Sequence, residues 1–148
     1  MPVDPPTAAP IEDCRGLTSA CAVWDITTGD TRRFCDRLDL IIDAVEQFEV
    51  NGIPVDFVIL LHAGATQFAA RTLKGTKFDG PDATDLSPAH ELLSRFAAAG
   101  GRIEVCGIAM ERSAIAPGNV IPCAVVERNV FVNAVALQNR GYAYMPIA

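Results

Sequence analysis

The sequence has no apolar run long enough to cross a membrane, and it has few basic residues. Its longest apolar stretch, residues 54–61, is the length of a strand and is interrupted by Asp56, whereas a membrane-spanning helix needs roughly 20 apolar residues. The chain has 12 Lys and Arg against 18 Asp and Glu, a net charge of -6, while nucleic-acid-binding proteins normally carry a basic face. We therefore expect no membrane partner and no nucleic-acid partner.

Cysteines are few and lack a regular spacing. The five lie at positions 14, 21, 35, 106 and 123, with no CxxC pair. An odd, irregular set argues against a disulfide framework, although Cys14 and Cys21 could bridge in an oxidising compartment. Reduced thiols favour the cytoplasm. Residues 1–10 lack the cationic start and apolar core of a signal peptide, and the periplasm is the alternative if a leader has been removed.

A chain of 148 residues with 50% hydrophobic and 20% charged residues has the size and composition of one soluble globular domain. The start of the chain is rich in proline, so we predict a flexible arm over residues 1–18. The remaining residues, 19–148, are predicted to form a single domain.

Short apolar runs alternate with amphipathic stretches, a pattern typical of an α/β fold with a largely parallel sheet. The apolar runs predict strands over residues 20–26, 54–61, 102–106, 120–124 and 142–145. The amphipathic stretches predict helices over residues 31–50, from Ser87 to Gly100, over 108–115 and over 127–140, with a short helix starting near Thr66. Asp30 and Ser87 are the predicted helix caps.

The last predicted helix is apolar on nearly every side. A helix that covers one face of a sheet needs an apolar stripe of only about 100°, and residues 130–137 exceed this. The surplus favours a contact between subunits, and deep burial inside one subunit is the alternative.

Cys106 is the candidate catalytic residue. It ends an apolar strand, and Gly107 and Ile108 follow as the start of a helix. Unpaired backbone N–H groups and the positive end of a helix dipole gather at such a point. Both stabilise a thiolate, which is the reactive form of cysteine. The alternative is a small buried apolar residue, a common role for cysteine.

Other candidate residues surround this position. His62 and Gly64 follow the second strand, and ligands of open α/β sheets bind near the carboxyl ends of strands. His62 could stabilise the Cys106 thiolate or bind an anion, or it could be a structural hydrogen-bonding residue. Cys123 is a possible second thiol, with simple packing as its alternative. We predict no metal site and no cofactor, since no close pair of ligands is present.

Four features in a fixed order resemble the DsrE/DsrF-like family of sulfur-relay proteins and their YchN-like relatives. A strand ends in His-x-Gly, a helix runs to Gly-Gly, and a strand ends in Val-Cys. The sequence Leu-Gln-x-x-Gly-Tyr-Ala-Tyr then closes the chain at residues 137–144. The resemblance covers roughly residues 23–146.

The resemblance implies a three-layer α/β/α sandwich with a five-stranded, largely parallel sheet. It also implies a homo-oligomer, commonly a trimer or hexamer, or a hetero-oligomer. Some members carry a cysteine, matched here by Cys106, that accepts sulfur as a persulfide and passes it to a partner protein. Other members lack it and have no established activity.

Two functions are therefore open at this point. The first is a persulfide carrier, a possible sulfurtransferase, with Cys106 as its nucleophile. The second is a non-catalytic oligomeric module that binds a small ligand or a protein. The second is favoured by the sequence Gly-Ile-Ala-Met after Cys106, which differs from the helix start of the sulfurtransferase subunits.

Overall fold

Five strands form one sheet in the order β4-β3-β2-β1-β5, and every neighbouring pair is parallel. The computed structural model describes residues 11–148. The strands are β1 Ala20–Ile26, β2 Val55–Leu61, β3 Arg102–Cys106, β4 Ala124–Glu127 and β5 Ala143–Ile147. The helices are α1 Thr31–Val50, α2 Ser87–Ala98, α3 Gly107–Arg112 and α4 Val130–Asn139. Short 3₁₀ turns are η1 Glu12–Cys14, η2 Ala63–Ala69 and η3 Pro117–Asn119.

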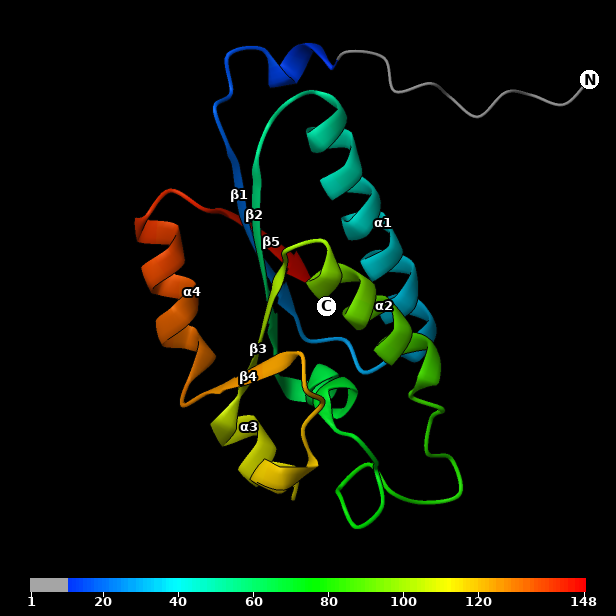
Figure 1. Cartoon of the computed structure of the whole chain (residues 1–148). Coiled ribbons are helices and arrows are strands. Elements are labelled where there is room, and N and C mark those ends of the chain that lie inside the picture. The colour runs from blue at the N-terminus through cyan, green and yellow to red at the C-terminus, as the bar shows by residue number, and fades with distance from the viewer. Residues whose placement is uncertain (1–10) are drawn as a thin grey trace, which may run out of the picture.

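Helices cover both faces of the sheet, which makes three layers. Helices α1 and α2 lie on one side, and α4 lies on the other (Figure 1). The larger apolar core fills the α1 and α2 side, and a smaller cluster lies under α4. The α/β/α sandwich with a parallel sheet is thus confirmed, because apolar strands flanked by amphipathic helices bury both faces of a parallel sheet.

Helix α1 shows how the sequence pattern produces this core. Its first turn is capped by Asp30, whose Oδ1 accepts the N–H of Arg33 at 2.8 Å. Apolar residues at helical spacing turn toward the sheet, and Phe34 and Leu38 are completely buried. Gly52, with φ at 73°, follows the end of the helix, a backbone conformation that glycine adopts without strain.

The fourth strand and the last helix begin later than predicted. Val120 forms an antiparallel bridge with Ala70, and the Ile121 N–H donates to Ala69 at 2.9 Å, so these residues cannot pair with β3. Pro122 has no N–H to donate, and β4 begins at Ala124. Helix α4 then begins at Val130, where the Oδ1 of Asn129 accepts the N–H of Phe131 at 3.1 Å.

Two other helix boundaries also differ from prediction. Helix α3 ends at Arg112 instead of residue 115, and Ala114 just beyond it has a φ of 55°. Ser87 lies inside α2 and does not cap it; the Oδ1 of Asp85 accepts the Ser87 N–H at 3.0 Å. The helix predicted near Thr66 is the 3₁₀ turn η2, which starts at Ala63.

The predicted arm lies partly outside the described residues, which begin at Ile11. Within residues 11–18, the turn η1 forms and Cys14 packs against the larger core. None of the helices between residues 11 and 148 combines the length and apolar character needed to span a bilayer.

Candidate functional site

The carboxyl ends of β2 and β3 bring His62 and Cys106 to neighbouring positions. The register pairs Leu61 with Val105, so the next residue of each strand faces the other, and adjacent strands lie about 4.8 Å apart. Cys106 belongs to the cluster under α4, with Val23, Val58, Leu60, Val130 and Leu137. His62 contacts Phe131 at the start of α4. Both predicted site residues therefore lie at the carboxyl edge of the sheet beside α4.

Cys106 is 7% exposed and directly precedes α3. Its side chain makes no capping hydrogen bond. The Ile108 N–H, which we predicted near the sulfur, donates to the carbonyl of Arg128 at 3.3 Å. A Cβ on Gly107 would lie 3.2 Å from the carbonyl oxygen of Glu127. Gly107 and Ile108 thus join the end of β3 to the end of β4.

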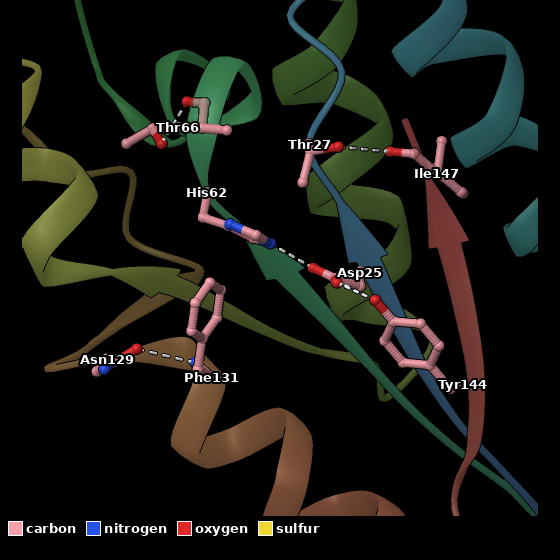
Figure 2. A network of polar contacts seen from close by, with 9 residues as sticks. Asp25, Thr27, His62, Thr66, Asn129, Phe131, Tyr144 and Ile147 are labelled. Carbon is pink, nitrogen blue, oxygen red and sulfur yellow. Dashed lines mark hydrogen bonds and ion pairs between the residues drawn. The ribbon is translucent and has the colours of Figure 1, made fainter.

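A polar network crosses three strands beside Cys106. The Nε2 of His62 makes a very short hydrogen bond to Oδ1 of Asp25, on β1. The hydroxyl of Tyr144, on β5, makes another to Oδ2 of the same carboxylate. Figure 2 shows the imidazole and the phenol converging on Asp25 from opposite sides. No hydrogen bond joins His62 to Cys106 among residues 11–148.

Asp25 is ionised at neutral pH in this network. Burial opposes its ionisation, but the hydrogen bonds from His62 and Tyr144 outweigh burial and lower the pKa of Asp25 below 3.8. The same contact with Asp25 raises the pKa of Tyr144, so the phenol keeps its proton and donates it. A carboxylate with both oxygens engaged holds the imidazole in one orientation.

Sequence reasoning missed Asp25 and Tyr144 as site residues. One feature of the sequence could have identified Asp25: it is an acidic residue inside an apolar strand, close to Ala22, Val23 and Ile26. Tyr144 belongs to the closing motif of residues 137–144, to which the sequence assigns no chemical role. Only the strand order places Tyr144 beside β1, because β5 is remote from β1 in sequence.

Two more residues shape the surroundings of His62. The ring of Phe131 stands edge-on to the imidazole, with centroids 5.6 Å apart. Gly64, a predicted site residue, makes its close backbone approach to another loop. A Cβ on Gly64 would lie 2.8 Å from the Gly29 nitrogen. The loops after β1 and β2 are therefore held together next to His62.

Glu104 is a buried acid on the same face, two residues before Cys106. It is 7% exposed, and its Oε2 accepts a hydrogen bond from the amide of Asn133 at 2.6 Å. Burial, and then the charge of Glu127, raise the pKa of Glu104 above 4.5. The position of Glu127 is paired with Cys106 across β3 and β4. The surroundings of the thiol thus include acidic groups that the sequence did not predict.

Cys123 does not join Cys106 as a second thiol. It precedes β4, whose first residue pairs with Ile103, so it lies toward the opposite end of the sheet. It packs against the larger core, on the other side from the Cys106 cluster. Burial raises the pKa of the Cys123 thiol. The predicted proximity arose from placing the fourth strand too early, at residues 120–124.

Within residues 11–148, no group of three His, Cys, Asp or Glu side chains is arranged to hold a metal ion. His90 is half-buried on α2, and its Nε2 has no hydrogen-bond partner among these residues.

A second aspartate–tyrosine contact lies at the other end of the same face. The hydroxyl of Tyr142 donates to Oδ2 of Asp56, at the start of β2. Arg102 also reaches Oδ1 of Asp56, at 3.3 Å. This cluster resembles the Asp25 network in its carboxylate and phenol but contains no histidine.

Comparison with known proteins agrees with this architecture. The chain is similar to a protein of unknown function, MTH1491, from Methanobacterium thermoautotrophicum, with 17% identity and a TM-score of 0.61. It is also similar to the ychN protein from E. coli, with 11% identity and a TM-score of 0.60. Each match covers 86% of this chain and 99% of the other. These identities show a shared fold.

No curated protein sequence matches the chain significantly. The profile of the DsrE/DsrF-like family, however, matches residues 31–147. This range contains Cys106, His62 and the closing motif of residues 137–144, and it covers more than half of the sequence. The chain therefore belongs to the DsrE/DsrF-like family, which is associated with sulfur relay.

Proposed function

We propose that this protein accepts a sulfur atom on Cys106 as a persulfide and passes it to a second thiol. The observation that carries the proposal is the place of Cys106 at the carboxyl end of β3, beside His62 on the α4 side of the sheet. The family's association with sulfur relay supports it. A donor and an acceptor of sulfur, each with a reactive thiol, are the partners that this function requires.

The chemistry is an exchange at divalent sulfur. The Cys106 thiolate attacks the terminal sulfur of a donor persulfide, the donor S–S bond breaks, and the donor leaves as a thiolate. Cys106 then carries the sulfur as a persulfide. Because an S–S bond is about 2 Å long, the carried sulfur extends beyond a thiol that is only 7% exposed. The loaded form is thus easier for an acceptor to reach than the thiol itself.

Loading of Cys106 tests the proposal directly. We expect the wild-type chain, incubated with glutathione persulfide, to gain one sulfur atom that peptide mass spectrometry places on Cys106. Cys106→Ser should lose this label completely, whereas Cys123→Ser, which alters a thiol of the larger core, should keep it. A label that persists in Cys106→Ser, or no label on Cys106 in the wild type, would contradict the proposal.

We also propose that the chain assembles into a homo-oligomer, a trimer or hexamer, through α4. Helix α4 buries only Val130 and Leu137, while Phe131 and Val132 are 65% and 66% exposed. Val135 and Val125 extend this apolar surface, and exposed apolar patches of this kind are typical of protein contacts.

Sedimentation velocity is expected to show an oligomer for the wild type and a shift toward monomer for Val132→Asp. Leu40→Asp is the control, because Leu40 is 57% exposed on α1, on the other side of the sheet. A wild-type chain that is monomeric at micromolar concentration would refute the assembly.

The alternative function is a non-catalytic module that binds a small apolar ligand. It is favoured by a cavity of about 470 Å³ lined by Trp24, Phe48, Phe57 and Met145, among others. The indole Nε1 of Trp24 has no hydrogen-bond partner within residues 11–148. A Cys106 thiol that reacts with iodoacetamide no faster than an ordinary thiol would favour this alternative.

A further inference from the structure

His62 is held by one ring nitrogen and keeps the other free. An ionised carboxylate can only accept a hydrogen bond, so the Nε2 that contacts Asp25 carries the hydrogen. In the neutral ring, Nδ1 then holds the lone pair. Nδ1 has no hydrogen-bond partner among residues 11–148, and it is not one of the buried unpartnered atoms there. It is therefore not fully sealed from solvent, although the His62 side chain is only 15% exposed, and it can act as a proton acceptor.

This histidine lies where a ligand of an α/β sheet would bind. The chain builds the sheet outward from β1 to β4 and then returns to place β5 on the other side of β1. Ligands of open α/β sheets bind outside the carboxyl ends of the strands, where the strand order reverses. Asp25 and Tyr144 join β1 to β5 at this reversal, and His62 extends the network (Figure 2). The strand register places His62 next to Cys106.

In a single subunit the two aromatic residues beside the imidazole are exposed, and one of them, Phe131, also belongs to the α4 surface proposed above as the subunit contact. Phe131 is 65% exposed and Tyr144 is 43% exposed, and they lie on either side of the His62–Asp25 pair (Figure 2). A small thiol, or the cysteine of a partner protein, that approached between them would reach the edge where Cys106 ends β3.

We propose that His62 is the acid–base catalyst that delivers sulfur from Cys106 to an acceptor thiol, and that Asp25 and Tyr144 are its positioning residues. The inference rests on the proposed function, in which Cys106 carries a persulfide. It specifies the acceptor as a protonated thiol, because a group that is already anionic needs no base.

The steps balance without an added oxidant or reductant. The Nδ1 of His62 takes the proton of the acceptor R–SH, which becomes R–S⁻. This thiolate attacks the terminal sulfur of the Cys106 persulfide, forming R–S–SH as the Cys106 S–S bond breaks and Cys106 leaves as a thiolate. His62 then releases the proton to solvent, and Cys106 is left as the thiolate that accepts the next sulfur. The resting protein is restored, and one sulfur has moved.

The pH dependence of this step follows from the acceptor. The strands around His62 carry these titratable groups: Cys21 and Asp25 on β1, Asp56 on β2, Arg102, Glu104 and Cys106 on β3, Glu127 on β4, and Tyr144 on β5. Helix α4 and the turn η2 carry none. Asp25 stays ionised above its lowered pKa, so the hydrogen-bonded pair of His62 and Asp25 is intact at neutral pH. A free thiol has a pKa of about 8.5. Above that pH the acceptor is already a thiolate, so it no longer requires a base.

The test compares discharge of preloaded protein to free cysteine and to cyanide across a pH series. Asp25→Asn removes the carboxylate that fixes the ring hydrogen on Nε2, so Nδ1 is no longer held as the nitrogen with the lone pair. General acid–base catalysis contributes roughly 10²–10⁴-fold. We expect Asp25→Asn to discharge to cysteine about 100-fold more slowly than wild type near neutral pH. At alkaline pH the rates of the variant and the wild type should become equal. Most cyanide is HCN near neutral pH, so its discharge rate is expressed per concentration of the CN⁻ anion. On that scale the attacking species has no proton to lose, and the rate should change little.

His62→Gln removes the same base without altering Asp25, and it should give the same pH-dependent ratio. Asp56→Asn is the matched control, because it breaks an aspartate–tyrosine contact on the same face that has no histidine, and its discharge should match wild type. The role of His62 would be overturned if the ratio of wild-type to variant discharge rates did not change with pH. It would also be overturned if that ratio were the same for cysteine and for cyanide. Failure of the wild type to load would instead refute the proposed function.

Discussion

Leu38→Ala is expected to lower the free energy of unfolding by about 2–5 kcal/mol. Leu38 is completely buried in the core between α1 and the sheet. Its truncation removes apolar contacts and leaves a cavity that the surrounding side chains fill only in part. Because a domain of this size is stable by only about 5–15 kcal/mol, this single change removes a large share of its stability. Urea unfolding followed by circular dichroism measures the effect.

Leu40→Ala is the matched control on the same helix. Leu40 lies two residues further along α1 and is 57% exposed, so the same atoms are removed from a site facing solvent. Its effect should stay within about 0.5 kcal/mol. Similar losses for the two variants would mean that the described face of α1 is not the one that packs on the sheet.

Gly64→Ala is expected to lower the free energy of unfolding by about 3 kcal/mol. The added Cβ would lie 2.8 Å from the nitrogen and 2.9 Å from the Cα of Gly29, and 3.1 Å from the carbonyl oxygen of Thr27. These are backbone atoms, which cannot rotate away as a side chain can. Relief requires the loops after β1 and β2 to separate, which would also displace His62 from Asp25. Chemical unfolding again measures the loss.

Gly118→Ala makes the same chemical change where a Cβ would have no neighbour within 4 Å. Both substitutions restrict the unfolded chain equally, so the difference between them reports the clash alone. Gly118→Ala should lie within about 0.5 kcal/mol of wild type. Equal stabilities for the two variants would contradict the close approach of Gly64 to Gly29.

The elements with strong local signals were predicted well. The predicted strand over residues 20–26 and the predicted helix over residues 31–50 match β1 and α1. Both were predictable because the spacing of apolar residues and the helix cap are signals that lie within a few residues of one another. The fourth strand was misplaced because Val120 and Ile121 look like a strand, yet they bond to the segment near Ala70. That competition between distant segments leaves no mark in the local pattern.

The sequence by itself determined the fold class, the family resemblance and the strand-end positions of Cys106 and His62. These depend on periodicity and on residue order, which are local properties. Only the tertiary structure decided which groups surround them: Asp25 and Tyr144 reach His62 because β5 lies beside β1. It also separated Cys123 from Cys106 and directed the Ile108 amide to Arg128. Strand order and side-chain contact join residues far apart in sequence, and no local pattern encodes such pairings.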